Sequence, residues 1–162
     1  MVINIVLFEP EIPQNTGNIA RSCAATGARL HLVGPLGFSI SDRYLKRAGL
    51  DYWHQVDVTA YENWETFIRQ HGGGSFFYAS TKSARPYTEP VYPEDVYLVF
   101  GPESRGLPED MLRADAGHCI RIPMRDDIRS LNLSNSVAII LYEVLRQQDF
   151  AGLETAGRLS GG

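Results

Sequence analysis

"INIVLF" at residues 3–8 and "YLVF" at residues 97–100 decide the fold class of this chain. A strand with one face in water alternates apolar and polar side chains, whereas these runs carry apolar side chains on both faces. Strands of that kind occur in parallel sheets that helices cover on each side. The two runs therefore predict an α/β protein with a mostly parallel, doubly wound sheet.

The rest of the chain repeats this alternation of short β-rich runs and helical segments. The predicted strands are Ile3 to Phe8, Leu30 to Val33, Gln55 to Val58, Phe76 to Ser80, Tyr97 to Phe100 and Cys119 to Ile122. The predicted helices are Ile19 to Thr26, Asp42 to Ala48, Tyr61 to Gln70, Pro108 to Leu112 and Ser134 to Gln148.

The bulk composition predicts one globular domain. The chain has 162 residues, of which 44% are hydrophobic, enough apolar material for one core. We assign residues 1–151 to this domain and expect residues 152–162, rich in glycine and small polar residues, to be a disordered tail. No apolar run approaches the roughly 20 residues that span a bilayer, and the first residues lack a signal-peptide pattern, so we expect a cytoplasmic protein. Cys23 and Cys119 are expected to be buried free thiols.

The net charge of −4 argues against a protein coated in positive charge for indiscriminate nucleic-acid binding. Basic residues still cluster locally. Arg43, Lys46 and Arg47 fall within five positions, and arginines recur every four residues from 121 to 129. On charge alone, such clusters are more often solvated faces than binding surfaces.

Ligands of doubly wound sheets bind at the carboxyl ends of the strands, so the loops that follow strands are the first place to look for a site. Three loops stand out: "EPEIPQNTGNIARSCAATG" (9–27), "GPESRGLP" (101–108) and "PMRDDIRSLNLSN" (123–135). In the first, Asn15 and Asn18 are expected to cap a helix. Arg21, one turn further on, either binds a phosphate near that helix start or faces solvent.

The second loop contains two glycines and two prolines, which predict an unusual turn that exposes backbone groups to an adenine or a ribose. It is not a P-loop, because Leu107 stands where the phosphate-binding lysine would be, and the chain has no Gly-x-Gly-x-x-Gly fingerprint. Glu103, the acid of this loop, binds a ligand or pairs with Arg105 or Arg21; the sequence leaves these alternatives open.

In the third loop, Pro123 should end the preceding strand and leave carbonyls free to read a base edge. Met124 either contacts a ligand or is plain packing. Between residues 130 and 136, five side chains that prefer caps and turns occupy seven positions, more than one helix needs. We expect Ser134 or Asn135 to cap the helix and the remaining polar side chains to face a ligand.

Other chemistries have little support in the sequence. No His-x-x-x-His or Cys-x-x-Cys pattern occurs and the histidines are scattered, so no metal site is expected. A Gly-x-Ser-x-Gly nucleophile elbow is absent as well. The apolar band of the helix from Val137 to Leu145 is too wide for a helix with one wet side, which favours a homodimer, although burial in the core of one chain would also explain it.

The three loops together resemble one family. "NTGNIAR", "LVFGPESRGLP" and "IRIPMRDDIRSLNLSNSVAIILYE", in this order, are similar to motifs of the SPOUT superfamily of RNA methyltransferases, in its SpoU-type 2′-O-ribose branch. The similarity runs from Ile3 to about Phe150. The start "NIVLFEPEIPQNTGNIARSCAATG" and the stretch "LKRAGLDYW" resemble in particular the TrmL-type enzymes, which methylate the wobble nucleotide (position 34, a cytidine or a modified uridine) of certain tRNAs.

The resemblance implies a C-terminal trefoil knot, a homodimer packed through the first and last helices, and S-adenosyl-L-methionine as the methyl donor. Matched by motif position, the residues implied to bind the donor are Ala79, Gly101, Glu103, Gly106, Ile122, Met124, Ser130 and Leu131. The residues implied to be catalytic are Arg21, Asn15, Glu103, Ser130 and Asn132.

Arg21 matches the family's candidate base, although a guanidinium normally keeps its proton. We therefore expect Arg21 first to hold a phosphate and to stabilise a developing alkoxide. The candidates for contacts to the anticodon stem-loop of tRNA are Arg43, Lys46, Arg47 and Tyr52. Two alternatives remain: methylation of another tRNA position or of ribosomal RNA, and a non-catalytic RNA-binding protein of the same fold.

Overall fold

The structure is a computed structural model that describes residues 1–43, 45, 47 and 52–161. Six strands form one parallel sheet in the order β3-β2-β1-β5-β4-β6. The sheet therefore has two halves, which extend in opposite directions from the central pair β1 and β5. The strands are β1 (Val2–Phe8), β2 (Arg29–Val33), β3 (Val58–Tyr61), β4 (Phe76–Ala79), β5 (Asp95–Phe100) and β6 (Cys119–Ile120).

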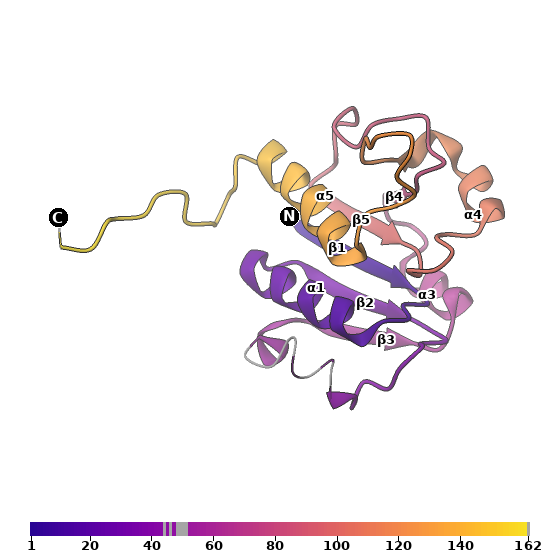
Figure 1. The fold of residues 1–162 in the computed structure, drawn as a ribbon, viewed down its shortest axis with the longest axis horizontal. Helices are drawn as coiled ribbons and strands as arrows, with labels where there is room; N and C mark the ends of the chain where they lie inside the picture. Colours follow the sequence, from indigo (N-terminus) through magenta and orange to yellow (C-terminus); the bar gives the residue numbers. More distant parts are fainter. Residues whose placement is uncertain (44, 46, 48–51, 162) are drawn as a thin grey trace.

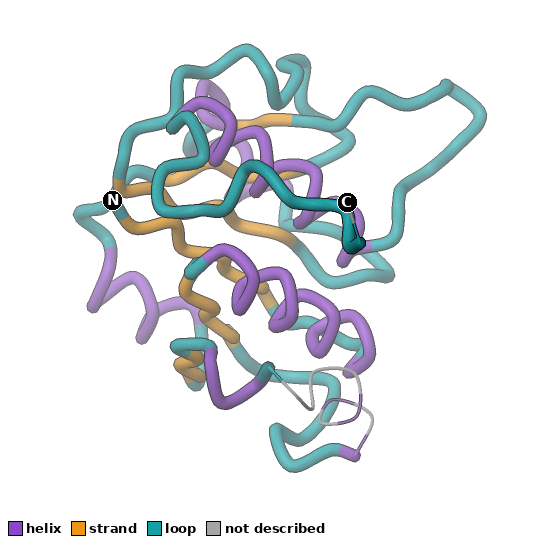
Figure 2. The backbone as a smooth tube through the Cα atoms, turned by 90° about the vertical axis from the view of Figure 1, so that its left-hand side faces the viewer, coloured by secondary structure: helices purple, strands orange, loops and turns teal. Residues whose placement is uncertain are grey.

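Helices cover both faces of this sheet (Figures 1 and 2). The long helices α1 (Pro13–Thr26) and α5 (Leu133–Gln147) lie side by side on one face. The shorter helices α3 (Trp64–His71) and α4 (Glu109–Ala114) pack on the other, and two 3-10 turns, η1 (Trp53–Gln55) and η2 (Ala116–His118), lie between elements. The predicted α/β class, with a parallel sheet between helices, is confirmed.

The central strand β1 shows why the sequence pattern predicted this arrangement. Ile5 and Leu7 are buried in the core under α1 and α5, whereas Val6 and Phe8 are buried in the core under α3 and α4. Fully burying each aliphatic side chain of this size contributes about 1.5–3 kcal/mol to folding. Asn4 is the polar exception in the strand, and its side chain is hydrogen-bonded within the sheet.

Two predicted elements between β2 and β4 are displaced along the chain. The predicted strand Gln55 to Val58 is wrong: Gln55 ends η1, and the strand runs Val58–Tyr61, where it pairs with β2 and Tyr61 enters the core. The predicted helix Tyr61 to Gln70 begins only at Trp64. The reason is Asn63, whose Oδ1 accepts the N–H of Thr66 at 2.9 Å and caps the helix.

Three further boundaries differ from the prediction. Helix α1 begins six residues before the predicted Ile19, so Asn15 and Asn18 lie inside the helix and do not cap it. Strand β6 ends at Ile120, two residues short of the prediction. The predicted helix Asp42 to Ala48 is helical at Arg43, Leu45 and Arg47, and its remaining positions after Asp42 lie outside the described residues. The other elements agree to within one or two residues.

Beyond α5 the chain turns at residues 148–152, and Leu153 still packs against the core; the chain then runs away from the body of the protein without helix or strand (Figure 1). None of the helices in the described ranges has the length and apolar character needed to cross a membrane. Cys23 and Cys119 are buried and unpaired, as predicted. Burial raises the pKa of the Cys23 thiol to about 12, so it is an inert core side chain.

Candidate functional site

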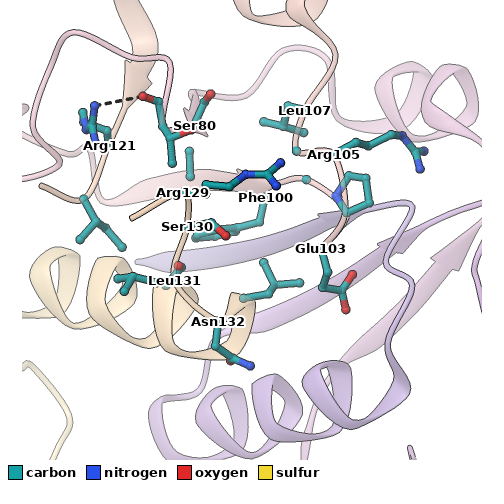
Figure 3. Close-up of a pocket in the computed structure, with 18 of the residues that line it drawn as sticks. Ser80, Phe100, Glu103, Arg105, Leu107, Arg121, Arg129, Ser130, Leu131 and Asn132 are labelled. Atoms are coloured by element: carbon teal, nitrogen blue, oxygen red, sulfur yellow. Dashed lines mark hydrogen bonds between the residues drawn. The ribbon is translucent and has the colours of Figure 1, made fainter. Parts of the chain in front are cut away.

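A cavity of about 830 Å³ lies at the carboxyl ends of β4, β5 and β6 (Figure 3). Its walls are residues 79–82 at the end of β4, residues 100–107 at the end of β5, and Arg121, Ile122 and Met124 after β6. Residues 129–133, which lead into α5, form the opposite wall, and Ile12 and Asn15 border it at the start of α1. The three loops that the sequence singled out therefore meet at one pocket.

The pocket contains most of the predicted site residues. All eight candidates for donor binding line it: Ala79, Gly101, Glu103, Gly106, Ile122, Met124, Ser130 and Leu131. Of the five candidate catalytic residues, Asn15, Glu103, Ser130 and Asn132 line it as well. Arg21 does not, and neither do the RNA candidates Arg43, Arg47 and Tyr52, while Lys46 lies outside the described residues.

Glycine is required at two positions of the second loop, for different reasons. A Cβ on Gly101 would lie 2.3 Å from the backbone nitrogen of Leu107, so the loop can close on itself only without a side chain there. Gly106 has a φ of 69°, the left-handed conformation that disfavours other residues. Leu107 then turns into the core under α4. The predicted unusual turn is thus built by a close backbone approach and one left-handed residue.

Two carboxylates tie the second loop to the first. Glu103 accepts the backbone N–H groups of Glu11 and Ile12, each at 2.8 Å, and the Asn15 side-chain amide at 3.1 Å. In return, Glu11 accepts the N–H and the hydroxyl of Ser104, at 2.8 and 2.9 Å. The hydrogen bonds from Ser104 hold the pKa of Glu11 below its usual value. We call Glu11, Glu103 and Ser104 the carboxylate clasp.

The carboxylate clasp stabilises the start of α1. Ile12, the N-cap residue, supplies no side-chain hydrogen bond, and Glu103 reaches across from the second loop to the free N–H groups at the helix start. The proposed pairing of Glu103 with Arg105 or Arg21 is wrong. Arg105 instead lies 2.6 Å from Glu9, which has a strained φ of 48° directly after β1.

Asn132 joins the third loop to this network. Its Oδ1 accepts the N–H groups of Ser134 and Asn135 at 2.9 and 3.3 Å, so Asn132 caps α5. The prediction that Ser134 or Asn135 would be the cap is therefore wrong. The Nδ2 of Asn132 donates to Asn15 Oδ1 at 3.1 Å, which links the starts of α5 and α1. Asn15 is 6% exposed and bonded on both sides, to Glu103 and to Asn132.

The backbone after β6 is free to bind a ligand. Ile122 and Met124 line the pocket, and neither residue's N–H or C=O is hydrogen-bonded to another described residue. Unpaired backbone groups at the wall of a cavity are available to an external partner, either a ligand or water. The expectation that Pro123 leaves carbonyls free is confirmed at these neighbours. Met124 is half-buried at the pocket wall.

Arg21 lies exposed on α1, outside the pocket lining. Its guanidinium carbon is 4.8 Å from the centre of the Tyr52 ring, a cation–π contact. One catalytic candidate and one RNA candidate therefore touch each other. The sequence did not predict the contact, because Tyr52 and η1 meet α1 only in the tertiary structure.

Comparison with known proteins defines the class of this protein. Residues 2–142 match the SpoU rRNA Methylase family, and the chain belongs to that family.

Two relatives and one more distant structure narrow the comparison. A tRNA (cytidine(34)-2′-O)-methyltransferase of Methylovorus glucosotrophus is 51% identical over 93% of this chain and 99% of its own. A solved structure from work on the 2-OH methylation of C/U34 on tRNA is 44% identical in sequence to this chain. Its TM-score is 0.88, and the comparison covers 92% of this chain and 97% of that one. An AdoMet-bound rRNA methyltransferase of Sinorhizobium meliloti is 29% identical, with a TM-score of 0.80 over 90% and 56% of the two chains.

Proposed function

We propose that this protein transfers a methyl group from S-adenosyl-L-methionine to the ribose 2′-hydroxyl of the wobble nucleotide, position 34, of a tRNA. The target is a cytidine or a modified uridine. The observation that carries the proposal is the pocket at the ends of β4, β5 and β6, whose lining includes every residue expected to bind the donor. The wobble position is supported by relatives that share about half of this sequence over nearly their whole length. We propose in addition that the enzyme is cytoplasmic, and that residues 1–151 form its single domain.

The pocket fits the donor by its chemistry. The free backbone groups of Ile122 and Met124 suit an adenine edge, and the closed turn at Gly101 and Gly106 suits a ribose. When bound, S-adenosylmethionine supplies an electrophilic methyl group on its sulfonium centre. We infer that residues 121–132 pass through the loop of residues 80–94 as a knot, since Arg121 is hydrogen-bonded to both Arg85 and Tyr87 of that loop.

The hydrogen bonds divide the candidate catalytic residues into two groups. Glu103, Asn15 and Asn132 are bonded to one another and to helix starts, so they serve as positioning residues. Ser130 is exposed, and its hydroxyl makes no hydrogen bond to another described residue, so it is free to orient the ribose. In-line transfer needs this alignment of the 2′-oxygen, together with removal of its proton.

We propose that Arg21 acts on the substrate from a homodimer interface. Tyr142 on α5 is 45% exposed and Ile139 is half-buried, so α5 keeps apolar surface outside its own core. Packing of two copies through α1 and α5 covers that surface and brings Arg21 into the interface. The contact with Tyr52 stabilises the guanidinium as a cation, which favours charge stabilisation over proton removal. Arg43 and Arg47, both exposed, remain the described candidates for phosphate contacts.

A methylation assay tests the proposal. Purified protein is incubated with donor labelled on its methyl group and with bulk tRNA, and the product is digested to nucleosides. We expect label in a 2′-O-methylated nucleoside that maps to position 34. Label at another position, or in ribosomal RNA only, would support the alternative substrates, and absence of label with intact donor binding would support a non-catalytic RNA-binding protein.

The Arg21→Ala variant tests the assignment of that residue. We expect turnover to fall by about 100-fold or more, the usual loss when a group that stabilises transition-state charge is removed. Donor affinity, measured by calorimetry, should stay unchanged because Arg21 does not line the pocket. Turnover equal to that of the wild type would remove Arg21 from the mechanism.

A further inference from the structure

One positive charge in the pocket has no partner. Four cationic side chains line the cavity, and three of them are engaged. Lys82 Nζ lies 2.5 Å from Glu109, Arg105 lies 2.6 Å from Glu9, and Arg121 donates to the carbonyl of Thr81 at 3.0 Å. The fourth, Arg129, makes no hydrogen bond or ion pair with any described residue.

The Arg129 side chain is directed into the pocket. Figure 3 shows it extending across the cavity, over Phe100 and toward the loop that follows β5, from the segment that carries Ser130 and Leu131. No carboxylate of the lining is free to meet it. Glu103 is the one acid among the described lining residues, and its oxygens are taken by three N–H donors.

A guanidinium placed in this way suits a planar oxyanion, which it binds through two parallel N–H···O hydrogen bonds. We propose that Arg129 binds the carboxylate of the methionine part of the methyl donor, an inference that rests on the proposed function. The carboxylate is the only anion that the donor carries. Its sulfonium and amino groups are cations, which Arg129 repels, so charge favours the carboxylate as the group of the donor that faces Arg129.

Arg125 provides a matched comparison within the same segment. Arg125 is exposed like Arg129 and lies four residues before it in the sequence. Its Nε is 3.5 Å from Asp127, however, and it does not line the pocket. Replacement of either arginine by methionine keeps an unbranched side chain and removes the charge. Both positions are exposed, so neither variant should change the unfolding temperature.

The test is a cycle that removes the carboxylate from the donor and the guanidinium from the protein. Calorimetry gives Kd values of S-adenosylmethionine and of decarboxylated S-adenosylmethionine for the wild type, Arg129→Met and Arg125→Met. We expect Arg129→Met to raise the Kd of the intact donor about tenfold. This is the lower end of the effect of losing a hydrogen bond between charged groups, because the site is partly open to water. Binding of the decarboxylated donor should not be weakened by Arg129→Met, since that donor has no carboxylate to lose a partner, and Arg125→Met should match the wild type with both ligands.

Two results would overturn the assignment. Equal weakening of both donors by Arg129→Met would mean that the side chain shapes the pocket without binding the carboxylate. Unchanged donor affinity with a smaller salt dependence of tRNA binding would assign Arg129 to an RNA phosphate. If the wild type bound neither donor, the proposed function itself would fail, which the cycle distinguishes from failure of this inference alone.

Discussion

Acidification should destabilise this protein through a chain of hydrogen bonds beneath α3. His31 is 5% exposed, and its ring nitrogens lie 2.8 Å from the Tyr61 hydroxyl and 2.8 Å from Asn4 Oδ1. Tyr61 also lies 2.9 Å from His71 Nε2, and His71 Nδ1 lies 2.9 Å from the Tyr97 hydroxyl. The perturbation is a second proton on His31, which gives this buried ring a positive charge.

The proton positions follow from the pattern of partners. Asn4 Nδ2 donates to the carbonyl of Val96, so Asn4 Oδ1 accepts, and His31 must carry its proton on Nε2. His31 Nδ1 then accepts the Tyr61 O–H, the Tyr61 oxygen accepts from His71 Nε2, and His71 Nδ1 accepts from Tyr97. Every group of the chain has a partner when both histidines are neutral. A second proton on His31 would turn its Nδ1 into a donor and would place a positive charge in the core, where burial disfavours it.

The magnitude comes from the pKa of His31. Burial, with a smaller contribution from the nearby His71, lowers this pKa from 6.5 to about 4. A shift of that size corresponds to about 3 kcal/mol of unfolding free energy. Between these two pKa values the unfolded chain binds the proton and the folded protein does not, so stability falls as the pH falls. From about pH 7 to about pH 5 the expected loss from His31 is about 2 kcal/mol.

Urea unfolding at several pH values between 7 and 5 measures this loss for the wild type and for His31→Phe. The variant should be less stable at pH 7, because the Tyr61 O–H loses its acceptor and Asn4 Oδ1 loses its donor, but its stability should depend much less on pH. The carboxylates with lowered pKa values, among them Glu143, lose their contribution mainly below this range. An equally steep pH dependence in both proteins would refute the reasoning.

Three substitutions test the hydrogen-bonded frame of the pocket. Glu11→Gln should lower turnover by about tenfold or more, because the carboxylate clasp loosens and the starts of α1 and of the second loop shift; a methylation assay with a parallel donor Kd separates misalignment from lost binding. Gly101→Ala should weaken donor binding and lower the free energy of unfolding by about 1–3 kcal/mol, since the new Cβ meets backbone at 2.3 Å. Gly73→Ala, whose Cβ has nothing within 4 Å, should change neither quantity in the same calorimetric and unfolding experiments. Asn132→Asp keeps the acceptor that caps α5 but loses the donor to Asn15, so the unfolding temperature should hold while turnover falls; an equal loss of both would mean that Asn132 only caps.

The layers of this fold could be predicted because the signal is local. Apolar residues on both faces of β1 and β5 require cover on both sides, and the structure supplies it with α1 and α5 on one face and α3 and α4 on the other. The position of the pocket could be predicted too, since it follows from the direction of parallel strands. Every residue matched to the donor by motif lines this pocket.

Contacts between distant parts of the chain could not be predicted. The sequence shows Glu103 as an acid in a glycine-framed loop, and nothing near it indicates that its partners are N–H groups about ninety residues earlier. Boundaries failed for the same reason: α1 starts before Ile19 because a distant carboxylate stabilises its first turn. His31 and His71 look unrelated in sequence, yet the fold joins them through Tyr61.

Helix capping and the walls of the pocket share residues in this protein, which accounts for Asn132 in the polar run before α5. Asn132 completes α5, Glu103 completes α1, and Asn15 connects the two, so the helix starts cannot form correctly unless the pocket walls are in place. The side chains of this network hold the walls, while the free backbone groups of Ile122 and Met124 face the cavity. Alanine at a network position removes a cap and a wall together, because one side chain serves both. Substitutions that remove only the donor or only the acceptor, as at Asn132, are therefore needed to separate catalysis from folding here.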